Sequence, residues 1–184
     1  TDGKFYTKTS GNVNFYNPET NSMESFDNID EEGLKVFRRN IQMIFQDPYE
    51  SLNPRWTIKD IIKEPLDIHN IGSLSEREEA VIEILRTVGL TPPENYLGRY
   101  PHEISGGQRQ RVSIARTLVM KPKFVVCDEP TSMLDVSIRI SIMDLMLNLA
   151  KELDVSYLYI THDLAVARYM CNRIAVMFNG KIVE

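Results

Sequence analysis

The feature that most constrains the fold is a pair of apolar segments separated by one long amphipathic segment. The residues FVVCD (124–128) form a nearly continuous apolar run, which is typical of a strand buried on both faces of a parallel sheet. The run SYLYITH (156–162) is the second apolar segment. Between them, apolar residues recur at helical spacing: Ile138, Ile142, Leu145, Leu149 and Leu153. A strand, a helix and a second strand in this order predict an α/β fold with a parallel sheet.

An earlier strand and a block of helices precede this unit. The strand is IQMIF (41–45), and helices are expected from there to about residue 121. The first of these helices is expected to end at Pro65, because proline disrupts a helix interior. Two helices are expected to open with a capping box, a pair of side chains that bond each other's backbone N–H groups: Thr57 with Asp60, and Ser75 with Glu78. The sequence therefore predicts a helical block inserted between the strands of the sheet.

The two ends of the sequence are less regular. Residues 1–33 are rich in Thr, Ser, Asn and Gly, and they predict only turns and edge strands, including KFY and VNFY. The last segment, RIAVMFNGKIVE, contains Asn179-Gly180, the dipeptide that most strongly favours a two-residue hairpin turn. We therefore expect a β-hairpin there.

The composition argues against several classes of protein. The net charge of −5 gives no basic surface of the kind that binds nucleic acid. No apolar run approaches the roughly 18–20 residues of a membrane-spanning helix. Cys127 and Cys171 lie far apart in apolar surroundings, so we expect reduced core residues rather than metal ligands.

Two consecutive acids follow the first apolar strand. Asp128 and Glu129 come at its carboxyl end, which is the edge where open α/β sheets bind ligands. Asp128 suits Mg²⁺, which takes hard oxygen ligands and keeps several waters. Glu129 suits a base aimed at an attacking water, a role worth about 10²–10⁴ in rate. Alternatively, Asp128 caps the next turn and Glu129 is merely solvated, because strand ends favour turn-forming acids.

An adjacent glycine pair occurs in ISGGQ (104–108). Ser105 and Gln108 fit a capping box that opens a helix, whose free N–H groups attract anions such as phosphate. A helix terminus contributes about 0.3–2 kcal/mol to an anion, whereas even millimolar binding needs about 4 kcal/mol. The glycine turn can therefore complete a phosphate site but cannot make one alone. The alternative is simply a well-capped helix.

Further polar residues occur at strand ends and at a helix start. His162 follows the strand YLYIT, and Gln46 follows IQMIF. Asp135 is expected to cap the helix that begins at Val136. Each has an ordinary structural interpretation when it is taken by itself.

From about residue 35 onward the chain resembles the ATP-binding subunit of ABC transporters. The match runs through IQMIFQDP with Gln46 of the Q-loop, the signature ISGGQ, and VVCDEP as the Walker B strand with its glutamate. It continues through SMLD as the D-loop and ITHD with the switch histidine, His162. These motifs in the family's order are far more specific than any one alone. The segments FQDPYESLNPRWTI and YPHEISGGQRQRVSIARTL look like the oligopeptide/dipeptide importer branch, which also includes nickel, glutathione and some sugar uptake systems.

The resemblance implies a role for each matching residue. Asp128 would hold the Mg²⁺ of MgATP, Glu129 would polarise the attacking water, and His162 would contact the γ-phosphate. Gln46 would link the metal and the water to the membrane partner. The signature residues would contact ATP that is bound to the other protomer: Ser105, Gly106, Gly107 and Gln108. Asp135 would also contact ATP.

The resemblance also implies an organisation. Residues 1–47 would be a remnant of the N-terminal β region and the Q-loop strand, 48–121 the helical signature subdomain, and 122–184 a RecA-like core of a P-loop NTPase. The partners would be a second ATPase subunit, transmembrane permease subunits and, indirectly, a solute-binding protein. The subunit would act as an ATPase, without nucleic acid, at the cytoplasmic face of the cell membrane.

The sequence departs from the family pattern in a few places. Ile104 and Met133 stand where leucine and alanine are usual, and these apolar exchanges should be tolerated. No G-x-x-x-x-G-K-[ST] segment occurs, because Gly3-Lys4 and Gly180-Lys181 are followed by Phe and Ile. We therefore expect that the N-terminal P-loop part and a C-terminal tail are missing. By itself, this chain should bind ATP poorly and hydrolyse it negligibly.

Two other functions remain to be weighed. One is a soluble ABC-type ATPase of DNA repair or translation. The short spacing between Gln46 and Ser105 leaves no room for the long coiled coil of the repair proteins, and the acidic charge also counts against it. The other is a regulatory relative without hydrolysis, and the presence of Glu129 and His162 counts against that.

Overall fold

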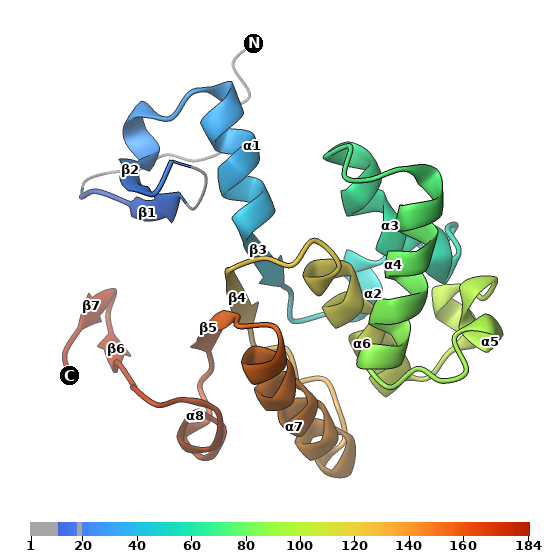
Figure 1. Cartoon of the computed structure of the whole chain (residues 1–184). Coiled ribbons are helices and arrows are strands. Elements are labelled where there is room, and N and C mark those ends of the chain that lie inside the picture. The colour runs from blue at the N-terminus through green and yellow to red at the C-terminus, as the bar shows by residue number, and fades with distance from the viewer. Residues whose placement is uncertain (1–10, 18–19) are drawn as a thin grey trace. The chain divides into compact units, whose positions relative to one another are not determined.

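The computed structural model describes residues 11–17 and 20–184, which divide into two compact units, Thr1–Arg39 and Asn40–Glu184 (Figure 1). In the first unit, β1 (Asn14–Asn17) pairs antiparallel with β2 (Ser22–Ser25). A 3-10 turn η1 (Phe26–Asn28) and helix α1 (Glu31–Asn40) follow. The strand predicted at VNFY is β1, whereas KFY lies outside the described residues.

Helix α1 was not predicted from the sequence. Its acidic residues, Glu31 and Glu32, lie in the first turn, and its basic residues, Arg38 and Arg39, lie in the last. This arrangement complements the helix dipole, in which the N-terminus is positive and the C-terminus negative. The ring of Phe37 packs against the ring of Phe15 in the same unit, with the two ring centroids 5.0 Å apart. The order of charges along the helix and the contacts of Phe37 with the rings of Phe15 and Phe26 therefore stabilise α1.

The second unit contains the predicted parallel sheet. It consists of β3 (Ile41–Ile44), β4 (Phe124–Asp128) and β5 (Ser156–Ile160), in the order β3-β4-β5 with both pairs parallel. The register places Ile44 beside Cys127 and Asp128 beside Ile160. The carboxyl ends of the strands therefore meet at one edge of the sheet.

One face of this sheet is more deeply buried than the other. Val125 and Cys127 of β4 are completely buried, while the residues that alternate with them are partly exposed. On β5, Leu158 is 50% exposed and Ile160 45% exposed. The prediction that FVVCD is buried on both faces was therefore wrong: its apolar character matched a buried strand, but only alternate residues of the strand are fully buried.

The helical block is present where it was predicted. It comprises α2 (Pro48–Ser51), α3 (Ile58–Ile68), α4 (Leu74–Thr87), α5 (Glu94–Leu97), η2 (Pro101–Glu103) and α6 (Gly106–Leu118). One cluster of buried apolar side chains runs from β3 and β4 through α6 to α3 and α4. The helical block and the sheet thus share a hydrophobic core.

Two details of the helical block differ from the prediction. Helix α3 does not end at Pro65 but continues to Ile68, because buried Ile61, Ile62 and Leu66 hold it to the core on both sides of the proline. The N-cap Thr57 is as predicted and accepts a hydrogen bond from the N–H of Asp60.

The second capping box lies two positions earlier than predicted. In helix α4 it joins Ser73 with Glu76 rather than Ser75 with Glu78. Glu78 instead forms an ion pair with Lys59, 2.5 Å apart. Serine and glutamate stand three positions apart in both pairs, so spacing alone did not identify the correct capping box.

The long helix and the hairpin of the C-terminal part follow the prediction closely. Helix α7 (Val136–Glu152) connects β4 to β5, and α8 (Leu164–Met170) follows β5. Strands β6 (Met177–Phe178) and β7 (Lys181–Ile182) form the expected hairpin, with Asn179 and Gly180 at φ values of 46° and 75°. Positive φ at both central residues is what a type I′ turn requires.

Both cysteines are free. Cys127 is fully buried, and burial raises the pKa of its thiol to about 12. Cys171 is only partly buried, so the prediction of two core cysteines is confirmed for the first alone. Among the described residues, no helix combines the length and the apolar character that crossing a membrane would need.

Candidate functional site

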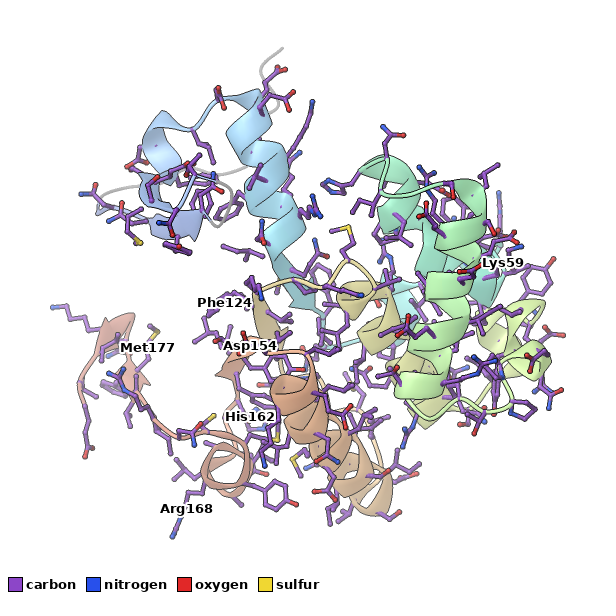
Figure 2. The ribbon with its side chains drawn as sticks, viewed as in Figure 1. Lys59, Phe124, Asp154, His162, Arg168 and Met177 are labelled. Atoms are coloured by element: carbon purple, nitrogen blue, oxygen red, sulfur yellow. The ribbon has the colours of Figure 1, made fainter. Side chains whose placement is uncertain are left out.

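Three polar side chains meet at the carboxyl edge of the sheet. Gln46, Glu129 and His162 follow β3, β4 and β5 respectively. The Nε2 atom of Gln46 donates to Oε2 of Glu129 at 3.3 Å, and Nδ1 of His162 lies 2.6 Å from Oε1 of the same carboxylate. Figure 2 shows Phe124 and Asp154 near the amino ends of β4 and β5, and His162 beyond the carboxyl end of β5. The structure therefore brings the three predicted catalytic residues together.

The backbone at Glu129 directs its side chain into this cluster. Its φ of 43° lies in the left-handed region, which is uncommon for a residue other than glycine and costs about 1–3 kcal/mol. Its N–H still donates to the carbonyl of Ile160 at 3.1 Å, which extends the β4–β5 pairing by one residue. The hydroxyl of Ser132 donates to the Glu129 carbonyl at 3.0 Å. These bonds hold the strained residue at the end of the strand.

The Glu129 carboxylate changes the properties of His162. Its hydrogen bond and its negative charge raise the pKa of the imidazole above the ordinary value of 6.5. The side chain of His162 is 78% exposed, whereas that of Glu129 is only 21% exposed. The histidine is therefore accessible to a ligand, while the carboxylate behind it is shielded.

Asp128 is the last residue of β4 and is half-buried. Within the described part of the chain, no side chain or N–H group hydrogen-bonds to its carboxylate, and no group of three His, Cys, Asp or Glu residues suited to a metal ion occurs. Mg²⁺ is usually bound by one or two carboxylates together with substrate phosphates, rather than by a cage of protein ligands. A single carboxylate at this edge fits that mode of binding.

The second candidate half-site is the signature turn, residues 104–108 at the start of α6. Its predicted capping box is confirmed: the N–H of Gln108 donates to Oγ of Ser105 at 3.2 Å, and the N–H of Ser105 donates to Oε1 of Gln108 at 2.9 Å. The Nε2 group of Gln108 also reaches the hydroxyl of Tyr96, 3.4 Å away. The turn is thus held mainly by its own residues.

The two glycines of the turn have different surroundings. A Cβ atom on Gly107 would lie 2.7 Å from Cγ2 of Ile138, so the close packing of α6 against α7 requires glycine there. A Cβ on Gly106 would make only ordinary contacts, with Leu134 at 3.8 Å and Arg109 at 4.0 Å. Packing within the chain therefore explains Gly107 but not Gly106, which leaves the first turn open to an approaching group.

Asp135 does not act as predicted. It occupies the N-cap position of α7, and its carbonyl accepts from the N–H of Arg139 at 2.8 Å. Its exposed side chain, however, makes no capping hydrogen bond. The prediction that its side chain caps this helix was wrong. Its predicted contact with nucleotide is not tested by this geometry.

The signature turn does not join the strand-end cluster. Within the described chain, no hydrogen bond or ion pair connects residues 104–108 with Gln46, Glu129 or His162. The two glycines of the turn pack beside Leu134 and Ile138, at the start of α7. The chain therefore carries two separate half-sites.

Comparison with known proteins identifies the family. The family profile described as ABC transporter matches residues 4–132, which is more than half of the chain. This chain belongs to the ABC transporter family. The chain spans about half the length of the curated relatives that it matches.

Two relatives and one solved structure illustrate the likeness of this ABC transporter chain. The oligopeptide transport ATP-binding protein AppF of Bacillus subtilis (strain 168) is 47% identical over 182 residues, 98% of this chain and 53% of that protein. The dipeptide transport ATP-binding protein DppF of Lactococcus lactis subsp. cremoris (strain MG1363) is 51% identical over 152 residues, 82% of this chain and 48% of that protein. A dimeric ATP-binding cassette in a post-hydrolysis state, bound to ADP and Pi, superposes with a TM-score of 0.77 at 31% identity, covering 96% of this chain and 72% of that one.

In this ABC transporter chain, sequence reasoning missed Ser132 as a member of the cluster. Its hydroxyl accepts from Nε2 of Gln46 at 3.3 Å while it donates to the carbonyl of Glu129. The signal was present, since serine hydroxyls in turns commonly bond backbone groups a few residues away. We refer to Gln46, Glu129, Ser132 and His162 below as the strand-end cluster.

Proposed function

We propose that this chain is the nucleotide-binding part of an ABC importer that couples ATP hydrolysis to the uptake of oligopeptides, dipeptides or a related solute. The observation that carries the proposal is the position of Glu129, held between Gln46 and His162 at the carboxyl edge of a parallel sheet. A shielded carboxylate between an amide and an accessible imidazole is the arrangement that activation of a water beside a phosphate needs.

Each residue of the edge has a role in this proposal. Glu129 accepts a proton from the attacking water, and His162 donates a hydrogen bond to the γ-phosphate. Gln46 orients the water, and a movement of Gln46 also moves the segment that follows it in the chain. Asp128 and Gln46 would hold Mg²⁺, which would supply positive charge to neutralise the phosphates of the nucleotide.

The signature turn serves a nucleotide on a second ATPase subunit. Ser105, Gly106, Gly107 and Gln108 present the N-terminus of α6, and Gly106 leaves room for the phosphate. A helix terminus contributes only about 0.3–2 kcal/mol to an anion, so this half-site needs the other half from a partner. Asp135, exposed at the start of α7, would also contact nucleotide.

The wider assembly follows from the same proposal. The helical block, 48–121, docks on transmembrane permease subunits, while 1–47 and 122–184 provide the rest of the nucleotide-binding core. The subunit therefore lies at the cytoplasmic face of the membrane and receives solute indirectly from a solute-binding protein. Relatives named for oligopeptide and dipeptide transport support peptides as the solute.

The test is Mg²⁺-dependent ATP hydrolysis by the full natural polypeptide that contains this sequence, together with peptide uptake in cells. We expect phosphate release that requires Mg²⁺, and we expect deletion of the gene to abolish growth on peptides as the amino-acid source. Hydrolysis with normal peptide uptake in the deletion strain would contradict the importer role. Absence of hydrolysis in the assembled transporter would contradict the ATPase role.

A further inference from the structure

We propose that Tyr49 and Arg109 form a positioning pair that couples the segment after Gln46 to the signature turn. The proposal rests on the function proposed above and adds two residues to it. In this view, Arg109 sets the shape and the charge of the turn, and Tyr49 ties Arg109 to the Q-loop segment. Neither residue touches the nucleotide on its own subunit.

Arg109 is buried directly behind the signature turn. It is only 6% exposed, and its NH1 group donates to the carbonyls of Pro101 at 2.9 Å and Ile104 at 2.8 Å. Ile104 is the first residue of the turn, and Pro101 lies three positions before it. Its NH2 group donates to the hydroxyl of Tyr49, and the guanidinium lies over the Tyr49 ring, 3.7 Å from the centroid. One side chain therefore connects the turn to α2.

Tyr49 is linked rigidly to Gln46. Asp47 caps α2, with its carboxylate accepting from the N–H of Tyr49 at 2.7 Å, and Pro48 occupies the first helical position. A capped turn that begins with proline has little freedom, because proline fixes φ and the cap fixes the entry of the chain. A displacement of Gln46 therefore carries Tyr49 with it.

The charge on Arg109 is placed where it favours an anion. In the described chain, no carboxylate lies within ion-pair distance of its guanidinium. A cation near a helix N-terminus is unfavourable for the helix itself. Here, NH2 lies 4.0 Å from the position of a Cβ on Gly106, so the positive charge adds to the field of the open turn. Burial reduces the screening of this charge by solvent.

A second arginine shows that α2 does not need Arg109 as an anchor. Arg116 lies about two helical turns further along the same face of α6. Its NH1 donates to the carbonyl of Ser51 at 3.2 Å, and its NH2 bonds Glu64 at 2.8 Å. Arg116 thus attaches α2 to α6 through the backbone of Ser51, and it attaches α3 to α6 through the carboxylate of Glu64. Tyr49 is 62% exposed, and its contact with Arg109 adds to the attachment that Arg116 already provides. This favours a role in coupling the segment after Gln46 to the signature turn.

The test compares Tyr49→Ala and Tyr49→Phe in the full natural polypeptide, by ATP turnover and by hydrogen exchange of the amides of residues 105–108. We expect Tyr49→Ala to lower kcat about tenfold while KM for ATP changes less than about twofold. The reason is that the signature turn would act when a second subunit closes over bound ATP, and not when ATP first binds. Tyr49→Phe keeps the ring over the guanidinium and should lose only about twofold. Exchange in the turn should rise in Tyr49→Ala.

Tyr16→Phe is the matched control, because Tyr16 is a comparably exposed tyrosine whose hydroxyl bonds Asn21 in the other unit. It should leave kcat, the melting temperature and exchange of the turn unchanged. Wild-type kcat and unchanged exchange in Tyr49→Ala would overturn the proposal, as would a fall in kcat explained by a matching loss of thermal stability. If the unsubstituted protein shows no turnover, the proposed function fails, and hydrogen exchange still decides whether Tyr49 controls the turn.

Discussion

The two half-sites of this chain are built in opposite ways. The signature turn is held by bonds between near neighbours, such as the two that join Ser105 with Gln108. The strand-end cluster is held by bonds between residues that are distant in sequence, such as Gln46 with Glu129 and His162 with Glu129. The first depends on local sequence, and the second depends on the register of the parallel sheet.

This difference has a consequence for substitutions. A side chain of the strand-end cluster lies at the rim of the sheet, so its loss should affect chemistry much more than folding. A residue of the signature turn also supports the packing of α6, so most substitutions there should affect both. Gly106 is the exception, because no close contact among the described residues requires glycine there. The predictions below test this contrast.

The largest effect is expected for Glu129→Gln. Removal of a general base lowers turnover by about 10²–10⁴, and the amide keeps the shape of the side chain. We expect kcat for ATP hydrolysis by the full natural polypeptide to fall by that factor, with little change in nucleotide binding or melting temperature. Phosphate release and a thermal melt on the same sample measure both quantities.

The matched control for Glu129→Gln is Glu152→Gln, the same change at the exposed end of α7. It should leave turnover unaltered. Undiminished hydrolysis in Glu129→Gln would show that another group activates the water, and a large loss of stability would show that the cluster supports the fold.

The next effect separates the two glycines. In Gly107→Ala, the new methyl group would lie 2.7 Å from Cγ2 of the stiff, β-branched Ile138. Overpacking costs about 1–3 kcal/mol, and the higher helix propensity of alanine offsets up to about 1 kcal/mol. We expect a lower melting temperature for Gly107→Ala, measured by circular dichroism.

Gly106→Ala is the companion variant. Its methyl group meets nothing closer than 3.8 Å, so the melting temperature should stay the same or rise slightly. The methyl would stand over the open turn and should reduce ATP turnover. Equal thermal losses in the two variants would refute the distinction between a packing glycine and a binding glycine.

A smaller effect compares two N-cap positions. Ser105→Ala removes a hydroxyl that caps α6, and such losses cost about 0.5–2 kcal/mol. Asp135→Ala removes a carboxylate that makes no capping bond to α7, so it should cost close to nothing. Urea denaturation of both variants gives the two free energies of unfolding. A larger cost for Asp135→Ala would mean that its side chain caps α7 in solution.

Local patterns allowed much of this structure to be predicted. The Ser105–Gln108 capping box and the Asn179-Gly180 hairpin depend on residues a few positions apart, and both were found where the sequence placed them. The meeting of Gln46, Glu129 and His162 could also be predicted, because parallel strands bring their carboxyl ends to one edge.

Other features depend on contacts that no short pattern contains. The continuation of α3 through Pro65 comes from burial of its neighbours, and the uncapped Asp135 comes from a turn geometry that the letters do not reveal. The contact of Arg109 with Tyr49 joins residues of two different helices. Such features follow from three-dimensional packing, which overrides local preference.

The smallest effect concerns the pH dependence of the strand-end cluster. Glu129 raises the pKa of His162 in the folded protein above its ordinary value of 6.5. Because the folded pKa is raised, the pair stabilises the fold fully below the unfolded pKa and loses this contribution as the pH rises through the folded pKa. The imidazole is exposed, so the effect on global stability should be small, and NMR titration of the ring is the sensitive measurement.

Glu129→Gln should lower the pKa of His162 towards 6.5, since it removes the main cause of the shift. Asp163 also raises this pKa, more weakly, so Asp163→Asn should produce a smaller decrease. The ring signal of His102, in the helical block, serves as an internal reference in the same spectra. A titration of His162 that Glu129→Gln leaves unchanged would show that the two side chains are apart in solution. The strand-end cluster would then be assembled by the nucleotide, and both half-sites would depend on a second molecule for their final geometry.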